Sequence, residues 1–342
     1  MDAASLTIRD VRGLASAGLA DDDAALAAVA SRYAIAITPD MARLIDRSDP
    51  ADPIARQFVP STDELDIKLD ETGDPIGDAR HTPVPGIVHR YRDRALLKVI
   101  SACPVYCRFC FRREMVGPGQ APPLTGETLD GALAYLAQHD EIREVILTGG
   151  DPFMLSPRRA AEIVARLEAM PHIRVLRWHT RVPVVDPGRV TPDFAAAIAS
   201  QRTAGWIAIH ANHPRELTEA AQFAIARLRK AGFALVSQSV LLKGVNDDVD
   251  TLAALMRGFV DLGIKPYYLH HADLAPGTSH FRTTIAEGRA LMRALHARIS
   301  GLALPTYVLD IPGGVSKAPL TPGYWRDGEV MSAEGEWLDY RG

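Results

Sequence analysis

The chain has 342 residues, of which 47% are hydrophobic and 23% are charged, and its formal net charge at pH 7 is −4. This composition is that of a globular protein and excludes wholesale disorder, and the lack of a basic excess indicates neither nucleic acid nor an anionic membrane as a partner. No apolar run approaches the roughly 18 residues that a membrane-spanning helix needs. The first residues, MDAASLTIRD, lack the basic and apolar regions of a signal peptide, so we expect a cytoplasmic protein.

Residues 1–85 are predicted to form a helical N-terminal region. Two stretches, 22–35 and 41–47, are apolar at helix-compatible spacing, and prolines and aspartates interrupt the rest of the region. The first 50 residues contain no motif that suggests chemistry. We interpret them as a structural lid or a subunit contact in a protein that we expect to form a homo-oligomer.

From residue 95 onward, short β-rich runs alternate with helical stretches. The predicted strands are 95–101, 144–149, 173–179, 206–211, 233–240, 264–270 and 306–311. The predicted helices are 126–138, 157–169, 191–200, 214–232, 248–263 and 284–300. Helix-boundary signals support them, namely Ser156-Pro157, Thr191-Pro192, Gly232 and Gly263. The alternation predicts an α/β protein with a parallel sheet, either doubly wound or barrel-like.

Polar residues follow nearly every predicted strand. They are Ser101, Thr148, Asp151, His179, Arg181, His210, Asn212, Gln238, His270, His271 and Asp310. Chemistry supplied by the carboxyl ends of almost all strands is typical of a barrel, whereas an open sheet gathers it at one switch point. We therefore predict a full or partial barrel over residues 86–320, followed by a short C-terminal tail over residues 321–342.

The three cysteines of the chain, Cys103, Cys107 and Cys110, lie within eight residues, just after the first of these strands. An odd number so close together is not a disulfide framework. Structural zinc prefers four ligands and would need a remote fourth one, such as His89. A [4Fe–4S] cluster normally takes four thiolates, and three would leave one iron open for a substrate or cofactor. An iron–sulfur electron carrier should have a fourth cysteine, and a zinc-stabilised binding protein is the other non-enzyme alternative.

The segment Thr148-Gly149-Gly150-Asp151-Pro152 ends the next predicted strand. Paired glycines allow close backbone approach, and free carbonyl groups at the strand end can accept hydrogen bonds from an ammonium group. Taken alone, the segment reads equally well as a tight turn with a helix-capping aspartate.

The spacing Cys-x3-Cys-x2-Cys, with Phe109 directly before the third cysteine, resembles the radical S-adenosylmethionine (SAM) family. The resemblance implies that the open iron chelates SAM and donates an electron to cleave it. It also implies that the Gly149-Gly150-Asp151 segment holds the amino group of SAM.

A more specific resemblance rests on several segments together, from about residue 50 to residue 320. They are Arg90-Tyr-Arg-Asp-Arg94, Cys110-Phe-Arg-Arg, HTRVPVV (179–185), HANHP (210–214), QSVLLKGVND (238–247), PYYLHHAD (266–273), HFRT (280–283) and PGGVSKAPL (312–320). As a set they are similar to the lysine 2,3-aminomutase family. This resemblance implies pyridoxal phosphate (PLP) as a second cofactor and a partial (β/α)6 TIM-type barrel of six strands.

The chain has 32 arginines and only six lysines, so candidates for a Schiff base with PLP are few. Lys317 lies in a Gly-Gly loop just after the last predicted strand, where a lone lysine is ordinarily solvated. The resemblance makes Lys317 the PLP lysine. It also makes Arg90 and Arg94 the ligands of the PLP phosphate, and it puts Gln238, on the next-to-last barrel strand, in the PLP pocket.

The resemblance also implies the substrate. Arg112 matches an arginine that binds the substrate carboxylate, and Asp273 and Asp310 match two carboxylates that bind a lysine side chain. A buried ammonium needs such paired negative charge, and a glutamate-selective relative would lack it. We therefore expect an isomerase that converts L-lysine to β-lysine by a 1,2-amino shift, which a 5′-deoxyadenosyl radical initiates, with flavodoxin or ferredoxin as electron donor.

Two features resemble a branch of the family whose β-lysine is ligated to elongation factor P. They are Cys110-Phe-Arg-Arg and the shortness of the chain. His270 stands where the free-lysine enzyme has a tyrosine, although it also reads as a packed strand-end histidine. Asp310 fits the free-lysine enzyme better, because the elongation factor P branch lacks an aspartate there. Both alternatives share the same chemistry, and a related amino acid 2,3-aminomutase is a further alternative.

Overall fold

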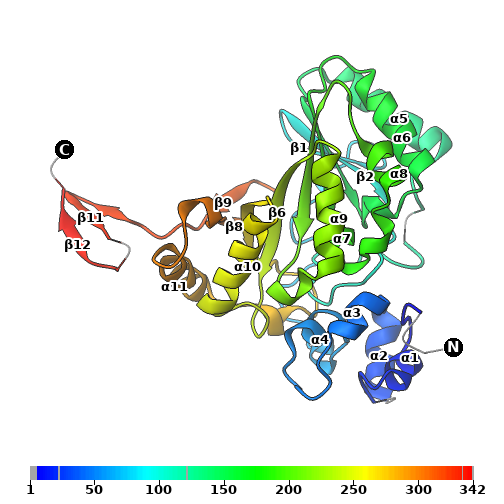
Figure 1. The fold of residues 1–342 in the computed structure, drawn as a ribbon. Coiled ribbons are helices and arrows are strands. Elements are labelled where there is room, and N and C mark those ends of the chain that lie inside the picture. The colour runs from blue at the N-terminus through cyan, green and yellow to red at the C-terminus, as the bar shows by residue number, and fades with distance from the viewer. Residues whose placement is uncertain (1–5, 22–23, 121, 333, 341–342) are drawn as a thin grey trace.

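The computed structural model describes residues 6–21, 24–120, 122–332 and 334–340 (Figure 1). Its main feature is a curled nine-stranded sheet in which neighbouring strands follow chain order from β1 to β9. No helix in these described ranges has the length and apolar character to cross a membrane.

The seven predicted strands all form, and they pair in parallel as a half-barrel. They are β2 (Arg94–Ile100), β3 (Glu144–Gly149), β4 (Val175–Thr180), β5 (Ala204–His210), β6 (Ala234–Leu241), β7 (Lys265–His271) and β8 (Thr306–Asp310). Six strand–helix units are therefore followed by a seventh parallel strand, β8. The predicted partial barrel is confirmed, with one strand more than the six that the resemblance implies.

The predicted helices of the barrel also form, and they cover the outer face of the sheet (Figure 1). They are α5 (Gly126–Gln138), α6 (Pro157–Glu168), α8 (Pro192–Ile198), α9 (Glu219–Lys230), α10 (Val249–Asp261) and α11 (Ile285–His296). Ser156 and Thr191 cap α6 and α8 through their hydroxyl oxygens, as their sequence signals indicate. Only α9 begins clearly later than predicted, because residues 214–216 form a separate 3-10 turn and Thr218 caps the helix.

Sequence patterns missed several short elements. Strand β1 (Ile87–Tyr91) pairs antiparallel with β2, and β9 (Lys317–Pro319) pairs antiparallel with β8. Both are edge strands, and burial does not alternate along β1, so this strand lacks the period-two pattern by which a strand is recognised. A four-residue helix, α7 (Val182–Val185), follows β4 and was also missed.

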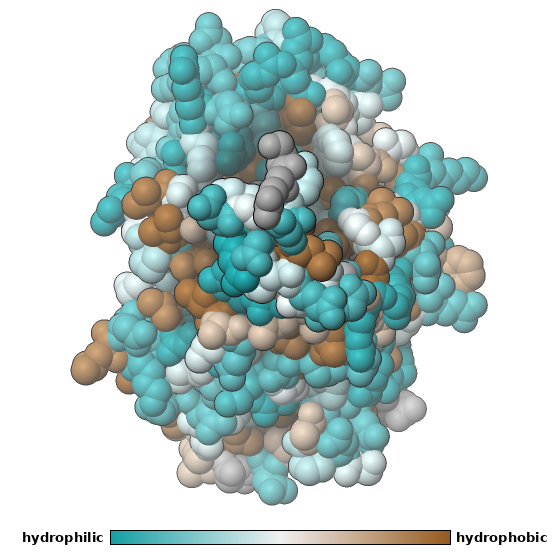
Figure 2. All heavy atoms as spheres, turned by 90° about the vertical axis from the view of Figure 1, so that its left-hand side faces the viewer, coloured by the Kyte–Doolittle hydropathy of each residue, from teal (hydrophilic) through white to brown (hydrophobic). Residues whose placement is uncertain are grey.

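The C-terminal segment, which the sequence suggests to be a short tail, contains a second sheet. Its strands are β10 (Trp325–Arg326), β11 (Glu329–Met331) and β12 (Trp337–Asp339), and the sheet projects away from the barrel (Figure 1). The face of the molecule that carries it is mainly hydrophilic with separate apolar patches (Figure 2). Trp325 and Leu338 of this sheet are among the exposed apolar side chains.

The N-terminal region is helical, as predicted. Its helices are α1 (Val11–Ser16), α2 (Ala24–Arg32), α3 (Pro39–Leu44) and α4 (Pro53–Phe58). The predicted stretch 22–35 contains α2, although Asp22 and Asp23 lie outside the described residues. Apolar side chains of this region, such as Leu14, Ile37 and Phe58, belong to the same core as the barrel strands and helices. The region therefore packs on the barrel.

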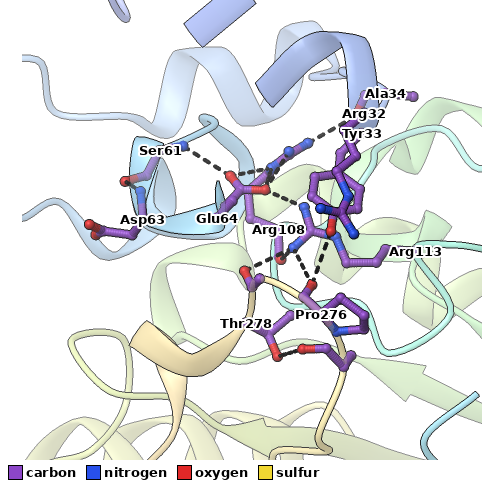
Figure 3. Close-up of polar contacts among 12 residues, drawn as sticks. Arg32, Tyr33, Ala34, Ser61, Asp63, Glu64, Arg108, Arg113, Pro276 and Thr278 are labelled. Atoms are coloured by element: carbon purple, nitrogen blue, oxygen red, sulfur yellow. Dashed lines mark hydrogen bonds and ion pairs between the residues drawn. The ribbon is translucent and has the colours of Figure 1, made fainter. Parts of the chain in front are cut away.

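A buried carboxylate ties this N-terminal region to the cysteine-bearing loop (Figure 3). Glu64, in the 3-10 turn Thr62–Leu65, accepts hydrogen bonds from Arg108 Nε at 2.9 Å and Arg108 Nη2 at 2.6 Å. Arg113 Nη2 donates to the same carboxylate. The Arg113 guanidinium also lies 3.5 Å from the centre of the Tyr33 ring in the N-terminal region. Two guanidiniums of the loop are thus held by one anion.

The charge of Glu64 depends on these two arginines. Burial alone would raise the pKa of the Glu64 carboxyl, but Arg108 and Arg113 outweigh it and hold the pKa below its ordinary value. The carboxylate therefore contributes stability above the pKa of an unfolded glutamate, and this contribution is lost as the pH falls through the folded-state value.

The first prediction concerns the barrel core. Trp178 on β4 is fully buried, whereas Trp206 on the neighbouring strand β5 is 37% exposed. We expect Trp178→Ala to lower the free energy of unfolding by about 3–5 kcal/mol, and Trp206→Ala to cost clearly less. Urea denaturation of both variants checks this, and equal losses would contradict it.

The second prediction concerns Glu64. Glu64→Gln keeps the shape but leaves two buried guanidiniums without an anion, and we expect a loss of about 3–5 kcal/mol in the free energy of unfolding at pH 7. The matched control is Glu162→Gln, which removes an exposed partner of Arg159 and should cost less than about 1 kcal/mol. The difference between Glu64→Gln and wild type should shrink as the pH falls below about 4. If Glu64→Gln lowered the free energy of unfolding no more than Glu162→Gln does, Glu64 would not be the anion that holds Arg108 and Arg113.

Candidate active site

The carboxyl ends of the parallel strands open into one cavity of about 470 Å³. All of the site residues that the sequence predicts line it: Arg90, Arg94, Cys103, Cys107, Cys110, Arg112, Gly149, Gly150, Asp151, Gln238, Asp273, Asp310 and Lys317. These predicted site residues come from distant parts of the sequence, since Arg90 and Lys317 are 227 positions apart, and the fold brings them together. The cavity continues along the barrel to the opposite strand ends, where Arg94 and Glu144 begin β2 and β3.

The three cysteines lie on a compact loop after β2, in which Cys110 N donates to Cys107 O at 3.1 Å. Burial raises the pKa of all three thiols, that of Cys110 to about 11, so a bound cation is needed to favour the thiolates at neutral pH. Among the described residues, no three His, Cys, Asp or Glu side chains converge to hold a single metal ion. A [4Fe–4S] cluster has no need of such convergence, because each thiolate binds a different iron.

Arg181 adds a contact to this loop. It follows β4, and its Nη1 donates to Cys107 Sγ at 2.9 Å. Its Nη2 donates to Glu216 Oε2 and to Gln57 Oε1, both at 2.6 Å. The sequence marks Arg181 only as a polar residue at a strand end. It gives no sign of Glu216 or Gln57, because these partners come from other elements.

Gly149 and Gly150 allow β3 to meet the cysteine-bearing loop at backbone distance. Gly149 has φ +126°, and a Cβ there would lie 2.2 Å from the carbonyl oxygen of Ile100. A Cβ on Gly150 would lie 2.3 Å from the carbonyl oxygen of Ala102. The Gly150 N–H donates to Ile100 O at 2.6 Å. The close approach expected from the paired glycines is therefore present, and it joins two segments of the protein.

Asp151 is fully engaged by the protein. Its carboxylate accepts hydrogen bonds from Phe153 N at 3.0 Å, Thr180 Oγ1 at 2.7 Å, Arg181 N at 2.7 Å and Val182 N at 3.2 Å. Burial raises the pKa of this carboxyl even though these donors act to lower it. The alternative of a capping aspartate is confirmed, and a contact of Asp151 with SAM stays a prediction.

The predicted phosphate ligands lie on the β1–β2 hairpin but in different surroundings. Arg90 is buried, donates to Ile76 O at 2.6 Å and lies 3.2 Å from Asp78 Oδ1 and 3.6 Å from Asp310 Oδ1. Arg94 is partly exposed, pairs with Asp93 at 2.8 Å and stacks 3.8 Å from the centre of the Tyr91 ring. The guanidinium of Arg94 is therefore more available to bind a phosphate than that of Arg90, which has more protein partners.

Arg112 is held in the cavity by Asp78, at 3.1 Å from Arg112 Nε to Asp78 Oδ2. Because Asp78 also binds Arg90, one carboxylate joins two predicted ligand-binding arginines. Burial alone would raise the pKa of the Asp78 carboxyl, but Arg112, Lys98 and Arg90 hold it below its ordinary value. Sequence reasoning missed Asp78, because a single aspartate in an aspartate-rich N-terminal region gives no signal.

Lys317 on β9 lies directly opposite Asp310 on β8 in the antiparallel register. Its Nζ is 2.6 Å from Asp310 Oδ1 and 2.5 Å from Asp310 Oδ2. His270 Nδ1 lies 3.3 Å from Asp310 Oδ2. Burial alone would raise the pKa of the Asp310 carboxyl, but His270 and Lys317 hold it well below its usual range. Asp310 is therefore the anion that balances Lys317 in this cavity.

Asp273 shares the cavity with Asp310 but differs in charge. Burial and the negative charge of Asp310 raise the pKa of Asp273 to about 7, against the opposite effect of Lys317, Arg112 and Arg90. The Asp273 carboxyl therefore keeps its proton to a much higher pH than an ordinary aspartate does. A ligand ammonium beside it would favour the ionised form.

Gln238 contacts the edge of this group, with its Nε2 3.5 Å from His270 Nε2. The prediction that it lies on the next-to-last barrel strand is wrong. It lies on β6, the third from last of the parallel strands, because both β7 and β8 extend the sheet beyond it.

Two half-buried histidines at strand ends, His179 and His210, also face the cavity, and the sequence assigns them no role. Burial lowers the pKa of His179 well below its ordinary value and that of His210 to about 3, so both rings are neutral. Their Nε2 atoms are buried without a hydrogen-bond partner in the described structure. Such unpartnered polar atoms in a cavity indicate that a ligand belongs there.

The residues present fit the implied cofactors. The chain has no fourth cysteine, which suits a cluster with one open iron. Within the described residues, Lys317 is the one lysine that lines the cavity, and it shares the cavity with several guanidiniums, which suits an aldehyde cofactor that carries a phosphate.

Comparisons with known proteins agree with this geometry. Residues 97–256 match the Radical SAM superfamily. The chain is 41% identical over 292 residues to a protein of Aquifex aeolicus, a match that covers 85% of this chain and 79% of that protein. It is 38% identical to the L-lysine 2,3-aminomutase of Clostridium subterminale, with 85% of this chain and 69% of that protein covered. The L-lysine 2,3-aminomutase of Escherichia coli K12 is also 38% identical, with 84% and 83% covered.

The relatives match 84–85% of the chain, and the superfamily match over residues 97–256 includes the cysteine-bearing loop and strands β3 to β6. The protein is an isomerase, and it belongs to the lysine 2,3-aminomutase family of radical SAM enzymes.

Proposed function

We propose that this enzyme converts L-lysine to β-lysine by a 1,2-amino shift that a 5′-deoxyadenosyl radical initiates. The observation that carries the proposal is the pair of carboxylates, Asp273 and Asp310, in the same cavity as Arg112. A diamino acid presents one carboxylate and a distant ammonium, and these groups complement one arginine and two acids.

The cofactors are assigned to the residues that fit them. Cys103, Cys107 and Cys110 would hold a [4Fe–4S] cluster, and SAM would bind at its open iron beside Gly149, Gly150 and Asp151. PLP would be held by Lys317, with Arg90 and Arg94 at its phosphate and Gln238 beside it. When bound, the reduced cluster with SAM supplies the radical, and PLP supplies a conjugated π system that takes part in the nitrogen shift.

The protein side chains prepare the cavity for this substrate. Arg112 gives up part of its contact with Asp78 to bind the substrate carboxylate. Asp273 would lose its proton beside the incoming substrate ammonium, and Asp310 would contact the same ammonium. The two carboxylates would then face two cations, the substrate ammonium and the ammonium group of Lys317. The surrounding barrel excludes water and other hydrogen donors from the reacting carbon.

The physiological product is free β-lysine in this proposal. The branch that serves elongation factor P carries out the same chemistry but lacks an aspartate at the position of Asp310. A reduced flavodoxin or ferredoxin would supply the electron. The alternative is that the β-lysine is ligated to elongation factor P. To test it, the product is incubated with elongation factor P and its lysyl ligase, and attachment of β-lysine to elongation factor P would favour this alternative over free β-lysine.

The third prediction tests the function directly. Under anaerobic conditions, the reconstituted enzyme with PLP, SAM and a low-potential reductant should form β-lysine from L-lysine, as detected by mass spectrometry after derivatisation. Lys317→Ala should lower the rate at least about 1000-fold, because PLP loses its covalent attachment. Lys230→Ala, which changes an exposed lysine on α9, is the matched control and should keep wild-type activity. If SAM were cleaved but no β-lysine formed, L-lysine would be excluded as the substrate, whereas the radical SAM chemistry would be supported.

The fourth prediction concerns Asp273. We expect Asp273→Asn to raise the KM for lysine about 10- to 100-fold, because an amide does not balance a buried ammonium. Asp261→Asn at the exposed end of α10 is the control. In wild type, kcat/KM should fall as the pH drops below about 7, because protonated Asp273 binds the ammonium poorly. The fall should be weaker in Asp273→Asn, and the same pH profile in both enzymes would contradict the assignment.

A further inference from the structure

Arg181 is buried beside the cysteine-bearing loop, and the amino-shift chemistry described above does not use it. Its side chain is 6% exposed, and its Nη1 lies 2.9 Å from Cys107 Sγ. Its guanidinium also lies 4.7 Å from the centre of the Phe58 ring and 5.3 Å from that of Phe109. A cation is thus held against the sulfur of one of the three cysteines in a water-poor environment.

Three independent contacts fix the position of this guanidinium. Glu216 and Gln57 each accept a hydrogen bond from Nη2 at 2.6 Å, and they come from the 3-10 turn after β5 and from helix α4. The backbone of Arg181 is held by Asp151, which accepts from its N–H at 2.7 Å. Glu216 is itself fully buried and held by the N–H groups of Asn212 and His213. Arg181 therefore cannot turn away from the sulfur without breaking buried contacts.

Such a contact acts on a cluster through charge. Reduction of a [4Fe–4S] cluster adds one negative charge, which is spread over the irons and their sulfur ligands. A positive hydrogen-bond donor at a ligand sulfur stabilises the reduced form more than the oxidised form and so raises the reduction potential. The effect is strong where water does not screen it.

We propose that the Arg181 guanidinium, as a hydrogen-bond donor to the sulfur of Cys107, raises the reduction potential of the cluster, with Glu216 and Gln57 as its positioning residues. One electron passes from an external one-electron reductant to the cluster, and no bond forms or breaks at Arg181. The inference rests on the assignment of Cys103, Cys107 and Cys110 as cluster ligands and is independent of the lysine assignment.

Other arginines near the loop do not share this geometry. Arg113 is also buried, but its guanidinium donates to Glu64 and to the backbone oxygens of Arg108 and Gly277, and among the described residues it donates to no cysteine sulfur. Arg113→Gln therefore removes a buried positive charge from the same loop without removing a donor to sulfur. It is the matched control for Arg181→Gln.

The experiment measures the midpoint potential of the reconstituted cluster by redox titration under anaerobic conditions, followed by electron paramagnetic resonance of the reduced form. Neither PLP nor lysine is added, and iron and sulfide are quantified per chain first. A wild-type protein that binds no cluster would refute the cysteine assignment itself. Failure of the separate β-lysine assay in a protein with a normal cluster would refute only the lysine assignment. The expected result is a shift to more negative potential in Arg181→Gln, a smaller shift in Arg181→Lys and a clearly smaller one in Arg113→Gln.

Two results would overturn the proposal. One is a fully loaded Arg181→Gln cluster that titrates at the wild-type potential. The other is an equal shift in Arg113→Gln, which would show that any buried charge near the loop has the same effect. If Arg181→Gln takes up no iron, Glu216→Gln replaces it, because this variant keeps the donor and removes its counter-anion. Its potential should then become more positive, and an unchanged or more negative value would overturn the role of Arg181.

Discussion

The cost of burying charge governs the centre of this molecule. The barrel gathers several guanidiniums and a lysine around one cavity, and burying any of these charges without a partner would be very unfavourable. The structure meets this constraint with single carboxylates that each hold more than one cationic or donor group. Glu64 holds Arg108 and Arg113, and Asp78 holds Arg90 and Arg112. Asp310 holds Lys317 and accepts from His270.

This arrangement explains why the cavity is organised before any ligand enters. The cations that would bind phosphate or carboxylate are already held in place by anions of the protein. A ligand anion would therefore replace a protein carboxylate as their partner, and little side-chain entropy would be lost on binding. The N-terminal region takes part in this organisation through Glu64, Asp78 and Gln57. These three residues lie after the first 50, and they supply counter-charges and a hydrogen-bond acceptor to the barrel. The interpretation of the first 50 residues as a structural lid or a subunit contact stays a prediction.

The sequence was sufficient for the repetitive part of the fold. Alternating strands and helices carry strong local signals, and the strand ends point to a barrel and to the residues around its cavity. The sequence was insufficient where an element is short or polar, as in β1, β9 and the C-terminal sheet. It also gave no sign of Asp78 or Glu216, because the partner of a buried charge is decided by packing between segments far apart in the chain. The roles of Arg90, Lys317 and Asp273 came from family resemblance, and the structure adds their surroundings.

The pairing of β8 with β9 has a consequence for how this chain can change. Lys317 faces Asp310 because six residues, 311–316, join the two antiparallel strands. Side chains alternate along a strand, so a connection one residue longer or shorter would turn Lys317 to the opposite face of the sheet while leaving the barrel folded. Gly77, next to Asp78, lies against the backbone of Gly313 in this connection, and a Cβ at Gly77 would be 2.6 Å from it. The length of this loop and the absence of a side chain at Gly77 therefore both preserve the register that places Lys317 opposite Asp310. If Lys317 has its proposed role, a single insertion in this loop would abolish activity without unfolding the barrel.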